Sequence, residues 1–265
     1  MVHKQLCLCL ALAVLSCAPA RAEKSPRERL NAAHAQYYTP TASGLKSFTC
    51  DATMDWKEML KRFSGKEIPD DNPVLKYLES VHLSVSDEFR GEGTLEWIGS
   101  APPAGKEEAL GQMRHGLQTA VAGFFQSWNA YMNGSMVPFP DQSMVLTSSG
   151  DGLHVSSVAK DTTIDEDYDK NLLLTQVLVV RPDIKVLATP TYTATDDGLI
   201  VTSVKSLVNQ PPSAPQTEAT FRIDYARVSD YQIPSRVVLD IKNTGEIELG
   251  FSGCKATMAD WARKQ

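Results

Sequence analysis

The amino-acid sequence predicts an α+β protein in which a large antiparallel sheet carries helices. Helical patterns dominate the chain up to residue 132, and strand patterns dominate from residue 144 onward. The connections between the later strands are too short for the crossover helices that parallel strands need, so the sheet must be antiparallel. The length of 265 residues fits one domain, which we place at residues 23–265 behind a leader.

Residues 1–22 are predicted to be an export signal. Lys4 supplies a positive charge, residues 6–15 form an apolar core, and residues 20–22 (Ala-Arg-Ala) match the cleavage pattern of a signal peptide. Ten apolar residues are too few for a permanent membrane span. A second interpretation stays open, because residues 14–17 resemble a loose lipobox in which Cys17 would become the lipidated first residue.

Cys50 and Cys254 are the cysteines that remain after the leader, and we expect them to form a disulfide. Two buried free thiols are the alternative. The bond would close a loop of about 204 residues, which chain-entropy scaling values at roughly 5 kcal/mol as an upper figure. Cys254 is out of phase with the apolar positions of its strand, and a bulge at residues 252–253 would restore the phase.

Four segments are predicted to be helical: 26–38, 56–64, 73–79 and 106–132. Ser25 and Pro26 suit the N-cap and first position of the first segment. The fourth segment has the strongest pattern, because its apolar residues recur every three or four positions. These are Leu110, Met113, Leu117, Val121, Phe124, Trp128 and Tyr131. Three glycines weaken this helix and predict either close backbone packing or a helix that can shift; they are Gly111, Gly116 and Gly123.

The predicted strands alternate apolar and polar residues, which indicates a sheet with one buried and one hydrated face. Residues 172–180 are apolar at most positions and are expected to be covered on both faces. The predicted strands are 46–55, 81–89, 144–147, 152–159, 172–180, 184–191, 199–207, 217–228, 232–242 and 245–253.

No catalytic signature is found in the sequence, and we expect neither an enzyme nor a cofactor or metal. A net charge of −6 without clustered Lys and Arg argues against a nucleic-acid partner. Residues 165–171 place oxygen ligands at alternate positions, but Lys170 and Gln176 stand where a calcium loop needs Gly and Glu. We interpret this run as a solvated acidic turn. A hydrolase with an unrecognised site remains a minor alternative.

The layout resembles the LolA-like and LolB-like carriers that sort lipoproteins to the outer membrane. An exported chain opens with a short helix and a strand that bears Phe48 and Cys50, and a long amphipathic helix and antiparallel strands follow. The closest local match is residues 221–241 (FRIDYARVSDYQIPSRVVLDI), a strand, turn and strand in which Tyr231, Ile233 and Pro234 restart the chain. The arginine that controls the lid in that family has no clear counterpart here.

This resemblance implies an unclosed antiparallel β half-barrel whose concave face is covered by helices. It also implies a periplasmic, monomeric carrier of lipid or lipoprotein acyl chains, with transient membrane association and a role in lipoprotein sorting. The implied ligand-binding residues lie on the long helix: Leu117, Val121, Phe124 and Trp128. The alternative is an outer-membrane-associated structural or assembly factor with a filled core and no ligand.

Overall fold

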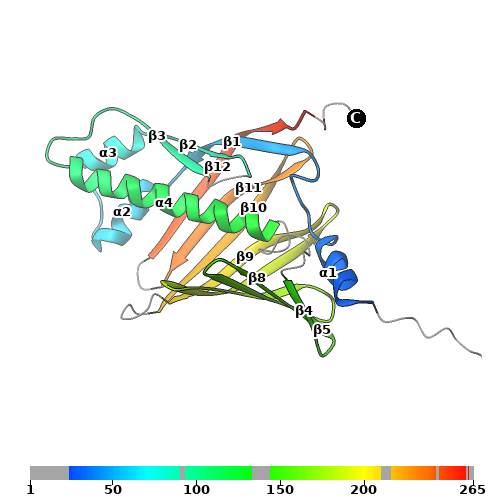
Figure 1. Ribbon diagram of the computed structural model, residues 1–265. Helices are drawn as coiled ribbons and strands as arrows, with labels where there is room; N and C mark the ends of the chain where they lie inside the picture. Colours follow the sequence, from blue (N-terminus) through cyan, green and yellow to red (C-terminus); the bar gives the residue numbers. More distant parts are fainter. Residues whose placement is uncertain are drawn as a thin grey trace, which may run out of the picture.

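The computed structural model describes residues 24–89, 93–132, 144–209, 216–242, 245–260 and 262, so the predicted leader and Cys17 lie outside the described residues. Within these ranges it has four helices and one sheet of twelve strands (Figure 1). The helices are α1 (Pro26–His34), α2 (Trp56–Ser64), α3 (Pro73–Glu79) and α4 (Glu107–Met132). The strands are β1 (Leu45–Thr53), β2 (His82–Asp87), β3 (Thr94–Ile98), β4 (Met144–Ser149), β5 (Gly152–Ala159), β6 (Thr162–Tyr168), β7 (Leu174–Arg181), β8 (Ile184–Thr195), β9 (Gly198–Asn209), β10 (Thr217–Val228), β11 (Tyr231–Ile241) and β12 (Gly245–Met258).

The sheet is antiparallel and open. Its order is β3-β2-β1-β12-β11-β10-β9-β8-β7-β6-β5-β4, so each strand from β4 to β12 lies beside its neighbour in sequence. Strand β1 then pairs with β12, which adds the N-terminal strands to the same sheet. The predicted α+β class with an unclosed antiparallel sheet is therefore confirmed.

Cys50 and Cys254 form the predicted disulfide, which joins β1 to β12. The register explains how the two sulfurs meet. Thr49 pairs with Lys255, but Asp51 pairs with Ser252, so β12 has one extra residue at this point. Gly253 adopts a positive φ of 58°, which glycine tolerates and which is typical of a bulge. The predicted bulge at residues 252–253 is thus confirmed.

Three of the helices begin at side chains that cap them. Ser25 and Glu28 form a capping box at α1, Asp55 accepts a hydrogen bond from the Glu58 amide at α2, and Asn72 caps α3. In Figure 1, α2 and α3 lie at one end of the sheet and α1 lies beside β4 and β5. The fourth helix, α4, lies across the inner face of the curved sheet.

Helix α1 ends at His34, four residues before the end predicted from sequence. The chain leaves the helix because its backbone pairs with β9 instead: the Tyr38 amide donates to the Leu199 carbonyl, and the Leu199 amide donates to the Gln36 carbonyl. The Tyr37 hydroxyl also accepts a hydrogen bond from the Leu174 amide at 2.8 Å. Tertiary pairing overrides the helical pattern here.

Strands β3 and β6 were not predicted from the sequence. Strand β6 includes residues 165–168 of the run that we interpreted as an acidic turn, so that interpretation was wrong for these residues, whereas residues 169–171 do form a turn. Its residues alternate, so that Glu166 points to the buried side while Asp165 and Asp167 point outward beside His154. Glu166 accepts a hydrogen bond from the Tyr168 hydroxyl at 2.9 Å.

Strand β7 is not buried on both faces as we had expected. Val177 is buried on the inner face of the sheet, but Leu178 and Val180 on the outer face are partly exposed. The expectation for residues 172–180 was therefore wrong.

Candidate ligand-binding site

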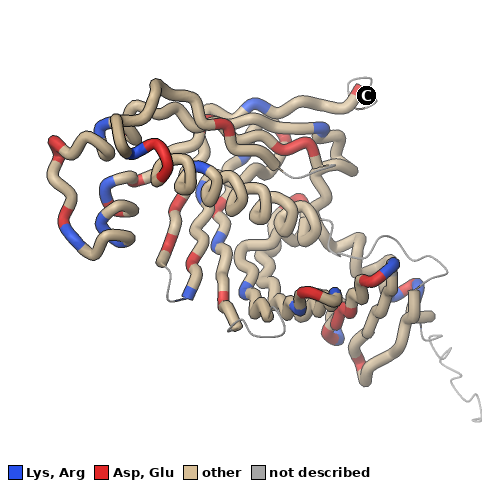
Figure 2. The backbone as a smooth tube through the Cα atoms, turned by 60° about the vertical axis from the view of Figure 1, so that its left-hand side comes forward, with Lys and Arg blue, Asp and Glu red and all other residues tan. Residues whose placement is uncertain are grey.

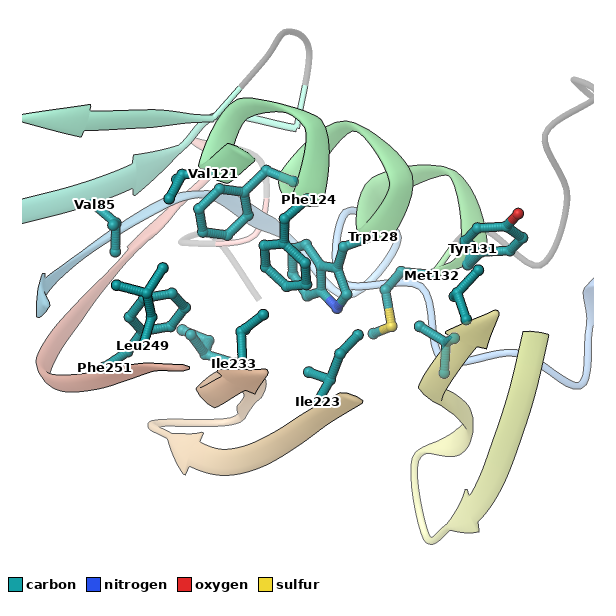
Figure 3. Close-up of a cluster of buried hydrophobic side chains, with 14 of the residues drawn as sticks. Val85, Val121, Phe124, Trp128, Tyr131, Met132, Ile223, Ile233, Leu249 and Phe251 are labelled. Atoms are coloured by element: carbon teal, nitrogen blue, oxygen red, sulfur yellow. The ribbon is translucent and has the colours of Figure 1, made fainter. Parts of the chain in front are cut away.

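Helix α4 is 26 residues long, about 39 Å, and it covers the inner face of the sheet with its apolar side. Figure 3 shows side chains of the helix pointing down toward strands of the sheet. The buried residues of the helix are Leu110, Leu117, Val121, Phe124, Phe125, Trp128, Tyr131 and Met132.

A groove lies between the middle of α4 and strands β10–β12. It is lined only by apolar side chains, four from the helix and five from the sheet: Leu117, Ala120, Val121, Phe124, Phe221, Val237, Leu239, Ile247 and Leu249. The free space is small, about 20 Å³, which is close to the room that one water molecule needs. A hydrocarbon chain could therefore enter only if α4 or the groove side chains moved.

The four helix residues implied by the family resemblance separate into two groups. Leu117, Val121 and Phe124 line the groove. Trp128 does not line the groove; it is only 1% exposed and belongs to the same hydrophobic core. Sequence reasoning missed Ala120 and all the sheet residues, although the alternation in the predicted strands 217–228 and 245–253 indicates one apolar face, on which Phe221, Ile247 and Leu249 lie. Periodicity identifies such a face, but it does not say which strands lie under a helix 100 residues away.

Trp128 anchors the C-terminal end of α4. Its indole nitrogen donates a hydrogen bond to the Tyr225 hydroxyl at 2.9 Å, and that hydroxyl donates to the Val201 carbonyl at 2.6 Å. Burial raises the pKa of Tyr225, although the hydrogen bond with Trp128 opposes this rise. The indole ring packs edge-on against Phe48 and near Phe125, with ring centroids 5.9 and 6.2 Å away.

A second polar contact fixes the same end of the helix. The Asn129 amide donates to the Asp87 carboxylate at 3.1 Å, and the Phe89 backbone amide donates to the same oxygen at 3.2 Å. Asp87 is 1% exposed, and its other carboxylate oxygen is buried without a hydrogen-bond partner. Burial raises the pKa of Asp87, and the hydrogen bonds from Asn129 and the backbone partly oppose it.

The middle of α4 has a weaker polar connection. The Gln118 side chain donates to the Leu95 carbonyl of β3 at 3.1 Å. On the groove side the contacts are apolar, including that of the Phe124 ring with the Phe221 ring at 5.6 Å. The two parts of the helix are thus held by different kinds of contact.

On strands β6–β9 the inner face is mostly aliphatic, and several tyrosines also lie near the buried Glu166. The Tyr37 and Tyr192 rings meet edge-on at 4.9 Å. Burial raises the pKa of Tyr37 to about 12, and the nearby Glu166 charge contributes to that rise. Burial also raises the pKa of Tyr131 and Tyr192, with Glu166 again contributing. This half of the sheet therefore has polar groups where the groove has none.

The outer face of strands β10–β12 carries ion pairs. Arg236 bonds Glu248 at 2.7 Å and Asp224 at 3.2 Å, and Arg222 bonds Glu246 at 2.6 Å. These bonds lower the pKa of Glu248 and raise that of Arg236. Figure 2 shows acidic and basic positions interspersed along the strands. The charges on this face are therefore balanced in close pairs.

Within the described ranges, no group of three or more His, Cys, Asp and Glu side chains is placed to hold a metal ion. No helix in the same ranges is long and apolar enough to cross a bilayer. The disulfide is compatible with an oxidising compartment. In comparisons with known proteins, no family model, curated protein or solved structure matches the chain.

Proposed function

We propose that this protein is an exported carrier that binds a hydrocarbon chain of a lipid or lipoprotein in the groove under α4. The observation that carries the proposal is the lining of that groove, in which all nine side chains are apolar. Apolar surface next to a helix that covers an open sheet suits a chain with no hydrogen-bonding groups. In this proposal the half-barrel is of the LolA-like kind and the polar headgroup of the ligand stays in water.

The periplasm is the proposed compartment. Residues 1–22 resemble an export signal in sequence, and the Cys50–Cys254 disulfide suits an oxidising environment. Sorting of lipoproteins to the outer membrane and transient contact with a membrane belong to the same proposal. The carrier acts as a monomer and without a cofactor.

A fluorescent fatty acid such as cis-parinaric acid tests the proposal, with a variant that fills the groove. Ala120 lines the groove, so Ala120→Trp should occupy its free space and reduce binding of the probe at least tenfold. Ala109 is an exposed residue of the same helix, so Ala109→Trp provides a matched control that should bind like the wild type. Equal binding by both variants would contradict a site in the groove.

One observation favours the alternative function, which is a structural or assembly factor with a filled core. Such a factor could also be anchored to the outer membrane through a lipid on Cys17. The free space of about 20 Å³ is too small for an acyl chain in this conformation. Native mass spectrometry of protein purified from its source separates the two functions. A carrier should show lipid that is bound non-covalently and is lost on denaturation, whereas a filled core should show none. Acyl groups attached to Cys17 would stay on the chain after denaturation.

A further inference from the structure

The three glycines of α4, Gly111, Gly116 and Gly123, lie on its exposed side. A methyl group added at any of them would meet no atom within 4 Å, so close backbone packing does not explain them. Gly93 shows the contrast, because a Cβ there would lie 2.3 Å from the Phe125 ring. Glycine inside a helix lowers helix stability relative to alanine. At the three positions in α4, no packing requirement offsets that loss.

These glycines bracket the part of the helix that covers the groove. The groove-lining residues Leu117, Ala120 and Val121 lie between Gly116 and Gly123, and Phe124 follows directly. The weakest part of the helix therefore lies over the candidate site. The next turns are fixed to the sheet through Trp128 and Asn129, whose partners Tyr225 and Asp87 are both largely buried.

We propose that the groove opens by local distortion of residues 111–123 of α4, while residues 125–132 stay docked on the sheet. This inference rests on the proposed function, since it describes how a ligand would reach that groove. The alternatives are departure of α4 as one rigid body and opening only by global unfolding. Each of these would expose the sheet under both parts of the helix together.

Two cysteine variants on the same strand distinguish these motions. Val237 lines the groove and is 3% exposed, whereas Ile233 is fully buried on the same strand, nearer to the Tyr225 that holds Trp128. Figure 3 shows Ile233 on the sheet beneath the helix. We would measure the rate at which a thiol reagent labels Val237→Cys and, separately, Ile233→Cys, without reductant so that the native disulfide stays intact.

Val237→Cys should be labelled at least tenfold faster than Ile233→Cys. Combining each with Gly111→Ala, Gly116→Ala and Gly123→Ala should slow labelling at position 237 by up to about a hundredfold, because three alanines stabilise the closed helix. Labelling at position 233 should change much less. Equal rates at the two positions, or a rate at position 237 that the three alanines leave unchanged, would overturn the proposal.

The same proteins also separate this inference from the proposed function. Binding and uptake of cis-parinaric acid are measured on the unlabelled wild type and on the triple-alanine variant. Slower uptake by the alanine variant supports both proposals, and its affinity should also fall, because the alanines favour the closed helix over the open state that admits the ligand. Uptake at the same rate, despite slower labelling at position 237, would overturn local opening as the entry step. If the wild type binds no probe but position 237 is still labelled faster than position 233, the proposed motion stands and the proposed carrier function is contradicted.

Discussion

The middle and the end of helix α4 face the same sheet but are held in different ways. At the end, Trp128 donates a hydrogen bond to the partly buried Tyr225, Asn129 donates one to the buried Asp87, and the Trp128 ring packs among other aromatic rings. In the middle, Leu117 and Val121 line a small apolar groove, and Gln118 makes a polar contact with β3. One continuous helix can therefore combine an end that is fixed to the sheet with a middle section that is suited to movement.

The largest effect should come from removing the anchor. Trp128→Ala should lower the free energy of unfolding by about 3–5 kcal/mol, because it empties a fully buried site and leaves Tyr225 without its donor. Denaturant unfolding of the variant measures this. Trp128→Phe serves as the control, since it keeps most of the ring contacts and loses the hydrogen bond. A loss below about 1 kcal/mol for Trp128→Ala would break the comparison between the two parts of α4.

A smaller effect is expected in the middle of the helix. Leu117 is buried but borders existing free space, so Leu117→Ala should lower the free energy of unfolding by about 2 kcal/mol, the lower end for such substitutions. The same denaturant experiment measures it. A loss as large as that of Trp128→Ala would mean that the groove is packed as tightly as the anchor.

The hydrogen bond of Gln118 in the middle of α4 should contribute less to the free energy of unfolding than either Trp128 or Leu117. Gln118→Ala removes one hydrogen bond, to a carbonyl on the outermost strand β3, and should cost about 0.5–1 kcal/mol. Its more informative effect is on movement, because labelling of Val237→Cys should become faster. If labelling at Ile233→Cys accelerates equally, the contact stabilises the whole fold and not the groove section alone.

Asp87 provides a test that depends on pH. Its pKa is raised in the folded protein, so the fold favours the protonated acid, and the stability from this group falls as pH rises through the raised pKa. Asp87→Asn does not titrate. The difference in free energy of unfolding between Asp87→Asn and the wild type should therefore grow in favour of the variant from pH 4 to pH 7. A difference that stays constant or shrinks would show that burial does not dominate at Asp87.

Alternation and turn signals predicted most strands and the antiparallel sheet, because short connections leave few other arrangements. The disulfide and its bulge could also be predicted, since the phase of Cys254 required an extra residue near Gly253. Strand β6 was missed because its inward positions include Glu166, and a buried carboxylate is uncommon in a strand. The end of α1 was missed because pairing with Leu199 comes from a distant part of the chain.

For the candidate site, sequence periodicity identified the inward side of α4 but did not separate the groove from the anchor. Phe124 and Trp128 are four residues apart and share one side of the helix, as predicted. What distinguishes them is the sheet beneath: Phe221 and Leu249 contribute to a groove, whereas Tyr225 supplies a hydroxyl to Trp128. Residues 221 and 225 belong to the same strand, and only the register of that strand against the helix decides their roles.

Photo-crosslinking with a diazirine-bearing fatty acid tests the central claim most directly. After irradiation and digestion, mass spectrometry identifies the peptides that carry the ligand. Our account predicts adducts on residues 117–124 of α4 and on the facing parts of β10–β12, and predicts that Ala120→Trp removes them while Ala109→Trp does not. Adducts confined to β4–β9, or none above the level of an unrelated protein, would contradict a lipid site in this groove.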